Sequence, residues 1–110
     1  MIGFVFATEE EAGPFLRRYQ RGRFDGLTEG ETLQDEHVLV TLTGVGKIKA
    51  TLRTERLLQH HRLSRLVHLG TCTALSEKLE VGAPVAVSQV FEGDRVELAT
   101  PTYPRMPLDV

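Results

Sequence analysis

The chain has 110 residues, a formal net charge of −2 and a hydrophobic content of 41%. A chain of this length can bury one modest core, so we expect a single domain or a part of one. The nearly balanced charge gives no reason to expect nucleic acid or an anionic membrane as a partner. The start of the chain lacks a signal-peptide pattern, and no apolar run approaches the roughly 20 residues of a membrane span. The sequence therefore predicts a soluble, cytoplasmic protein.

The first predicted strand and helix lie at the start of the chain. Ile2–Phe6 is short and continuously apolar, as in a strand covered on both faces. Thr8 is a candidate N-cap, and Glu11 follows it at the spacing of a capping box. Pro14 predicts a helix that is kinked near its start or begins late. The residues that fall on one helical face are Ala12, Phe15, Leu16 and Tyr19.

The middle of the chain alternates between strands and a helix. Residues 22–37 are polar and predict short antiparallel strands joined by turns. Val38–Gly44 is expected to be a strand, Val45–His61 a helix, and Arg65–Cys72 a buried strand. A helix that connects two apolar strands typically forms a parallel crossover within a sheet covered by helices. The pattern therefore predicts an α/β fold.

The last third of the chain gives weaker signals. We expect a turn at Glu80–Pro84 and an alternating strand at Val85–Val90. Ala99–Val110 contains three prolines and is expected to form a loop without strand or helix. We expect a sheet that leads into an open loop to be either incomplete or closed with very few strands.

Cysteine and histidine are sparse. Cys72 is the only cysteine, so no disulfide can form within the chain, and no Cys/His spacing resembles a zinc site. A lone cysteine is most often a small buried residue, and no base adjoins Cys72 in the sequence to activate its thiol. His68 lies in an apolar segment, where a hydrogen-bonded core histidine is the expected reading.

Four segments, in this order and at these separations, resemble the N-terminal half of the purine nucleoside phosphorylase and nucleosidase superfamily. They are Ile2–Leu16, Thr41–Leu58, Val67–Leu75 and Lys78–Asp94. Within that superfamily they are most similar to methylthioadenosine/S-adenosylhomocysteine nucleosidases. The resemblance implies a three-layer α/β/α fold around a central mixed sheet, of which residues 1–110 form the N-terminal half of a single domain. It also implies a small-molecule nucleoside substrate, no metal or organic cofactor, and a homodimer or larger oligomer.

Glu11 falls where the resemblance implies the carboxylate that orients and deprotonates the attacking water. Cleavage of an N-ribosyl bond passes through an oxocarbenium-like sugar, which a nearby carboxylate can stabilise while it activates the nucleophile. From the residues alone, a capping box with Thr8 explains Glu11, and the helix dipole explains Glu9 and Glu10. Three adjacent acids would repel a phosphate, which favours hydrolysis over phosphorolysis.

The resemblance also implies a set of residues that line the substrate pocket: Val45, Thr71, Cys72 and Thr73. Val45 stands in a strand-to-helix turn that lies near the 5′ substituent of the sugar in that family, although such turns are also common without a ligand. Thr73 and Ala74 occupy positions where glycines are expected. This departure leaves open a different nucleosidase, such as a futalosine hydrolase. A nucleoside phosphorylase and a non-catalytic remnant or binding domain also remain alternatives.

The resemblance places two further functional groups in a C-terminal half. These are a glutamate that binds the ribose and an aspartate that protonates the leaving base, and nothing after Asp94 resembles either. Without a general acid the base would have to leave as an anion, which is much harder. We therefore expect the 110-residue chain to be inactive by itself.

Overall fold

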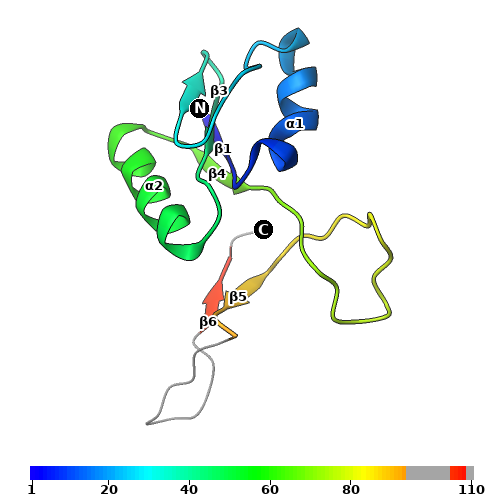
Figure 1. Cartoon of the computed structure of the whole chain (residues 1–110). Helices are drawn as coiled ribbons and strands as arrows, with labels where there is room; N and C mark the ends of the chain where they lie inside the picture. Colours follow the sequence, from blue (N-terminus) through cyan, green and yellow to red (C-terminus); the bar gives the residue numbers. More distant parts are fainter. Residues whose placement is uncertain (94–104, 109–110) are drawn as a thin grey trace. The chain divides into compact units, whose positions relative to one another are not determined.

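The computed structural model describes residues 1–93 and 105–108. The chain divides into two units, residues 1–73 and 74–110. The first unit contains β1 (Ile2–Phe6), α1 (Glu9–Arg18), the short 3-10 helix η1 (Tyr19–Arg21), β2 (Thr32–Gln34), β3 (Val38–Leu42), α2 (Lys47–His60) and β4 (Arg65–His68). The second unit contains β5 (Gln89–Phe91) and β6 (Arg105–Pro107), and both units are drawn in Figure 1.

The first unit is built on a four-stranded mixed sheet with the strand order β2-β3-β1-β4. Strand β1 is parallel to both of its neighbours, and Ile2 aligns with Val38 of β3 and with Arg65 of β4. Strand β2 is antiparallel to β3, with Thr32 opposite Thr41. Because β1 lies between β3 and β4, helix α2 must cross over β1. The carboxyl ends of β1, β3 and β4 therefore meet at one edge of the sheet.

The two helices cover opposite faces of this sheet (Figure 1). Successive side chains of a strand point to opposite faces, so each strand contributes to two cores. The core on the α1 face consists of Phe6, Ala12, Leu16, Phe24, Leu27, Val40 and Leu42. The core on the α2 face consists of Val5, Leu39 and Leu57, with Leu63 packed against them. This arrangement confirms the predicted three-layer α/β/α fold.

Helix α1 begins at Glu9, so the alternative of a late start is wrong. The hydroxyl of Thr8 accepts a hydrogen bond from the amide of Glu11 at 3.2 Å, which caps the first turn. Pro14 lies inside the helix, where its missing N–H leaves the carbonyl of Glu10 without the usual helical hydrogen bond. The predicted cap at Thr8 is therefore confirmed, and the cap sets where the helix begins.

Strand β4 was expected to be buried, and this expectation is wrong. Leu66 is 36% exposed, and His68 is exposed rather than held in the core. The reason is the position of β4 at the edge of the four-stranded sheet, where it pairs with β1 alone among the described strands. Cys72, just beyond β4, is also exposed and not buried as expected.

The second unit departs from the predicted pattern. Strand β5 begins at Gln89, so the strand expected over Val85–Val90 is wrong in its first four residues. Strand β6 lies within the segment expected to be a loop, so that expectation is wrong for Arg105–Pro107, while residues 99–104 lie outside the described residues. The physical reason is antiparallel pairing between two short segments, in which Val90 lies opposite Met106.

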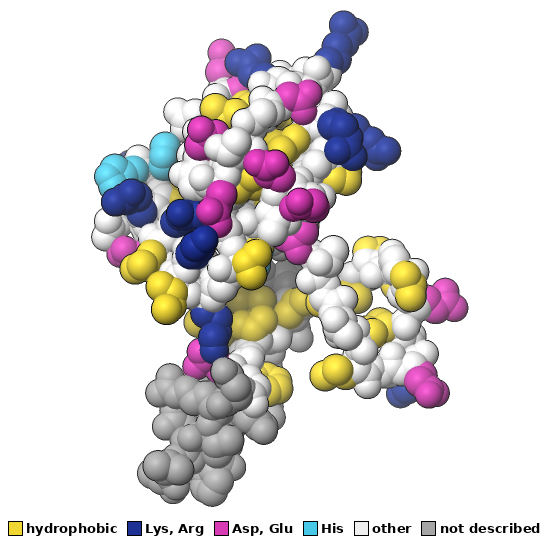
Figure 2. Space-filling model, in the orientation of Figure 1, with side chains coloured by type: hydrophobic (Ala, Val, Ile, Leu, Met, Phe, Trp, Pro, Cys, Tyr) yellow, Lys and Arg dark blue, Asp and Glu magenta, His cyan; other side chains and the backbone are white. Residues whose placement is uncertain are grey.

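Residues 74–88 form an irregular segment whose hydrophobic side chains lie on its surface, as Figure 2 shows. Leu75 and Val81 are fully exposed.

In the ranges that the structure describes, no helix is both long enough and apolar enough to cross a membrane.

Asp35 fixes the turn between β2 and β3. Its Oδ1 accepts hydrogen bonds from the amides of His37 at 2.8 Å and Val38 at 2.9 Å. Its Oδ2 accepts a hydrogen bond from the hydroxyl of Tyr19 at 2.7 Å, which ties the turn to the end of α1. These bonds stabilise the ionised carboxylate and lower the pKa of Asp35 from 3.8 to about 2, with the amide of His37 contributing most.

Acid should therefore weaken the first unit through Asp35. The folded-state pKa of Asp35 lies below its unfolded value, so its contribution to stability is complete above about pH 4 and is lost as the pH falls towards 2. We expect the stability difference between the wild type and Asp35→Asn to shrink over that interval. Chemical denaturation of both proteins measures this stability difference, at pH values from 2 to 6 that are about one unit apart. Parallel profiles for the two proteins would contradict this assignment.

Candidate functional site

The candidate site lies at the carboxyl edge of the sheet. Strands β1 and β3 are neighbours, and the helices that follow them lie on opposite faces (Figure 1), which is the arrangement at which open α/β sheets commonly bind ligands. Backbone hydrogen bonds hold the three exit segments together. The amide of Thr43 donates to Phe6 O at 2.9 Å, that of Gly44 to Ala7 O at 2.8 Å, and that of Leu69 to Val5 O at 3.0 Å.

Glu11 and Thr71 meet at this edge although they lie 60 residues apart in the sequence. Glu11 Oε1 accepts hydrogen bonds from the backbone amide of Thr71 at 3.1 Å and from its hydroxyl at 3.0 Å. Glu11 Oε2 is buried and has no hydrogen-bond partner among the described residues. A Cβ atom at Gly70 would lie 3.3 Å from Oε1, so glycine at this position lets the chain approach the carboxylate. One oxygen is therefore fixed and the other is unsatisfied.

The surroundings of Glu11 favour its charged form. The amide of Thr71 contributes most to lowering the pKa of Glu11 below 4.5, and burial opposes this effect. The hydroxyl of Thr71 and the charge of His68 lower the pKa further. The side chain of Glu11 is therefore an ionised acceptor at neutral pH, able to receive a hydrogen bond and to offset a positive charge. Because the carboxylate of Glu11 accepts hydrogen bonds from Thr71, a helix cap alone does not explain the position of this side chain.

Val45 stands at the tip of the turn between β3 and α2. Gly44 and Gly46 flank it with φ values of +81° and +113°, a region of backbone conformation that favours glycine. Val45 is 72% exposed. It lines a hollow of about 210 Å³ at the carboxyl edge, together with Ala7, Thr8, Glu9, Glu10, Glu29, Leu42 and Gly44. The hollow is acidic, and Figure 2 shows several Asp and Glu side chains gathered on one face of this unit.

The structure brings some of the predicted site residues together and leaves others exposed to solvent. The structure brings Glu11 and Thr71 into contact and places Val45 at the same edge of the sheet. Cys72 and Thr73 follow Thr71 with exposed side chains. Within residues 1–93 and 105–108, no group of three or more His, Cys, Asp or Glu side chains is placed to hold a metal ion.

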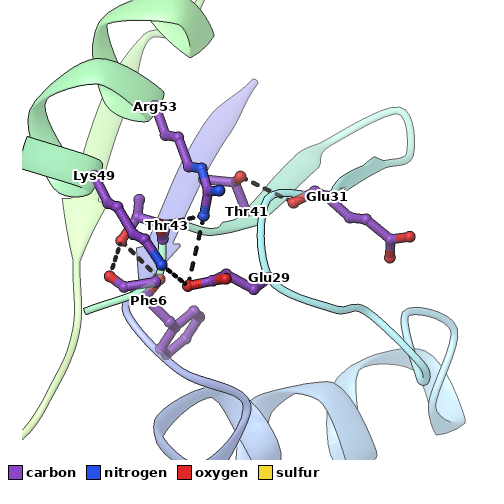
Figure 3. Close-up of polar contacts among 8 residues, drawn as sticks. Phe6, Glu29, Glu31, Thr41, Thr43, Lys49 and Arg53 are labelled. Carbon is purple, nitrogen blue, oxygen red and sulfur yellow. Dashed lines mark hydrogen bonds and ion pairs between the residues drawn. The ribbon is translucent and has the colours of Figure 1, made fainter. Parts of the chain in front are cut away.

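Sequence analysis did not identify Glu29, which sits against the Gly44–Gly46 turn. Lys49 Nζ forms an ion pair with Glu29 Oε1 at 2.9 Å, and Arg53 Nη1 lies 3.7 Å from the same oxygen (Figure 3). One signal was available in the sequence. The first turn of α2 contains no acidic residue, although helix N-termini favour negative charge. Glu29 supplies that charge from a distant part of the chain.

The comparisons with known proteins agree with this fold. The family model described as the phosphorylase superfamily matches residues 1–107. The chain belongs to the phosphorylase superfamily, which confirms the predicted family.

Among curated proteins, the chain is similar to the 5′-methylthioadenosine/S-adenosylhomocysteine nucleosidases of Staphylococcus aureus strains JH9, Newman and JH1. It is 29% identical to each over 91 residues, which cover 74% of this chain and 38% of the relative. The chain thus spans about two fifths of the length of these relatives. No solved structure matches it significantly.

The hydrogen bond from the hydroxyl of Thr71 should help to keep the pKa of Glu11 low. Thr71→Val removes the hydroxyl donor and keeps the backbone amide, so we expect the pKa of Glu11 to rise towards 4.5 without fully reaching it. NMR titration of the Glu11 side-chain carboxyl carbon measures the change. Thr73→Val in the same segment is the matched control and should leave that titration unchanged. An unchanged pKa in Thr71→Val would show that the hydroxyl does not stabilise the carboxylate.

Proposed function

We propose that this chain supplies part of a nucleosidase active site, in which Glu11 activates water to hydrolyse the N-ribosyl bond of a purine-type nucleoside. The observation that carries the proposal is the Glu11 carboxylate at the carboxyl edge of the sheet. Its Oε1 is held by Thr71, and its buried Oε2 is unsatisfied. The nucleosidase relatives support the class of substrate. Val45, Thr71, Cys72 and Thr73 would line the substrate pocket.

The proposed chemistry uses the ionised form of Glu11. A water hydrogen-bonded to Oε2 attacks C1′ of the ribose and gives its proton to the carboxylate. The bond between C1′ and the base nitrogen breaks, and its electron pair leaves with the base. A general acid in a C-terminal half protonates the base as this bond breaks, so that the base leaves as a neutral molecule. The negative charge of Glu11 also stabilises the oxocarbenium-like sugar as the bond breaks.

The charge of the neighbouring hollow supports hydrolysis over phosphorolysis. Among the described residues, its lining contains the carboxylates of Glu9, Glu10 and Glu29 and no lysine or arginine. The charge of Glu29 is offset by Lys49 and Arg53, so Glu9 and Glu10 make the hollow negative. A phosphate ion would be repelled there, whereas a neutral water would not. Related alternatives are a nucleoside phosphorylase, a futalosine hydrolase, and a binding domain without catalysis. The family resemblance supports a cytoplasmic homodimer or larger oligomer that acts in nucleoside catabolism, including methionine salvage.

A chimera tests this proposal. Residues 1–93 would replace the matching segment of the Staphylococcus aureus nucleosidase, which then supplies the remaining length. We expect base release from at least one of methylthioadenosine, S-adenosylhomocysteine, inosine and futalosine, and none from the 110-residue chain alone. A folded chimera that cleaves none of them would contradict the proposal and favour a binding domain. Enzyme-like release by the chain alone would overturn the placement of the general acid in a C-terminal half.

A further inference from the structure

The Gly44–Gly46 turn is held by side chains that come from outside it. Strand β3 ends at Leu42, and the next carbonyl, that of Thr43, accepts a hydrogen bond from Arg53 Nη1 at 2.6 Å (Figure 3). Thr43 is only 1% exposed. A buried carbonyl at the end of a strand needs a donor, and a guanidinium makes a charge-assisted bond of the stronger kind. Arg53 thus satisfies the first peptide group beyond the sheet.

Thr43 is also hydrogen-bonded to the backbone of the turn and to the end of β1. Its hydroxyl donates to Gly44 O at 3.0 Å and lies 3.5 Å from Phe6 O. Its own amide and that of Gly44 bond to the exit of β1 at Phe6 and Ala7. The turn is therefore bonded to the end of β1 at Phe6 and Ala7.

Glu29 closes the other side of the turn. The amide of Gly30 donates to Leu42 O at 2.8 Å, which brings Glu29 beside the end of β3. A Cβ atom at Gly44 would collide with the carboxylate of Glu29, so the two groups are packed together. Lys49 and Arg53 both face Glu29, and the bond from Lys49 is the largest contribution lowering the pKa of Glu29. The ionised carboxylate draws both cations of α2 towards the turn.

We propose that Arg53 is a positioning residue that, with Glu29, holds the Gly44–Gly46 turn so that Val45 is presented at the substrate site. The role assigned to Val45 rests on the proposed function, whereas the restraint of the turn does not. Arg53 lies two turns of helix into α2 and touches no group proposed to react. Its loss should loosen the turn and weaken substrate binding, while the chemistry at Glu11 continues.

The first experiment uses the full 110-residue chain and measures hydrogen exchange at single amides by NMR. In Arg53→Gln we expect exchange at Thr43 and Gly44 to accelerate by about tenfold or more, because a charge-assisted bond is lost. The amide of Leu39 in the centre of the sheet should keep its rate. Arg53→Lys retains one donor and the charge, so it should restore part of the protection. Arg56→Gln, on the same helix, is the matched control and should not change the exchange rate at Thr43 or Gly44.

Two results of this experiment would overturn the restraint. One is unchanged exchange at Thr43 and Gly44 in Arg53→Gln. The other is equal acceleration at Leu39, which would show general loss of stability instead of a loosened turn. Neither result depends on catalysis by the chain.

The second experiment measures KM and kcat for nucleoside cleavage by the chimera. We expect Arg53→Gln to raise KM by about tenfold and to change kcat by less than about twofold, because uniform binding is lost and the reacting groups are kept. An unchanged KM would contradict the positioning role. If the unmodified chimera cleaves no nucleoside, the proposed function fails, and the exchange measurement still decides whether Arg53 restrains the turn.

Discussion

Replacing Glu11 with glutamine is expected to lower the rate of base release by the chimera by about 10²–10⁴-fold, the usual cost of a lost general base. Glutamine cannot take a proton from water or offer a full negative charge to the sugar. It can still accept the two hydrogen bonds that Thr71 donates to Oε1. The cap of α1 depends on the hydroxyl of Thr8 and is not altered. The melting temperature should therefore change little, whereas the rate of base release should fall by the factor given above.

The matched control for this substitution is Glu36→Gln, which removes the same charge from an exposed position in the β2–β3 turn. It should leave both the rate and the melting temperature nearly unchanged. Steady-state assays of base release, together with thermal melting of each variant, make the comparison. Full activity in Glu11→Gln would reduce the acidic cluster to its role at the start of the helix.

The largest effect on stability is expected from Phe24→Ala. Phe24 is 2% exposed in the core on the α1 face, and its ring stacks on that of Tyr19 at a centroid distance of 5.2 Å. Truncation of a buried phenylalanine costs about 3–5 kcal/mol, because transfer energy is lost and a cavity remains. Whole domains are stable by only about 5–15 kcal/mol, so much of the stability of the first unit would be lost.

Urea unfolding monitored by far-UV circular dichroism measures the cost of Phe24→Ala. Leu33→Ala on β2 is the control, because Leu33 is 37% exposed and its removal creates no buried cavity. We expect its effect to be below about 1 kcal/mol. Equal effects for the two variants would show that the core on the α1 face does not carry the stability of this unit.

The central part of the fold could be predicted because its signals are local. The apolar runs of β1 and β3 and the helical spacing of α2 depend on neighbouring residues only, and the structure confirms them. The strands of the second unit could not be predicted in the same way. Strands β5 and β6 are short and exist through pairing with each other, so the pattern of either segment alone carries little information. The exposure of His68 depends on where β4 sits in the sheet.

The candidate site shows the same limit. Glu11 and Thr71 could each be named from the family resemblance, but their contact depends on β1 and β4 lying side by side in one register. Glu29 was missed, because it belongs to a polar segment without a motif. The missing acid in the first turn of α2 indicates that a negative charge comes from elsewhere, but it does not identify the residue that supplies it. The family resemblance therefore identified the candidate carboxylate, and the sheet determined its partner.

The identity of the sugar product distinguishes hydrolysis by this site from phosphorolysis. The chimera would cleave its best nucleoside in ¹⁸O-labelled water that also contains inorganic phosphate, and mass spectrometry would follow the sugar. Activation of water by Glu11 predicts a free sugar that carries ¹⁸O at C1′, with no sugar phosphate formed. A sugar 1-phosphate without ¹⁸O at C1′ would contradict hydrolysis and assign the chain to the phosphorylases.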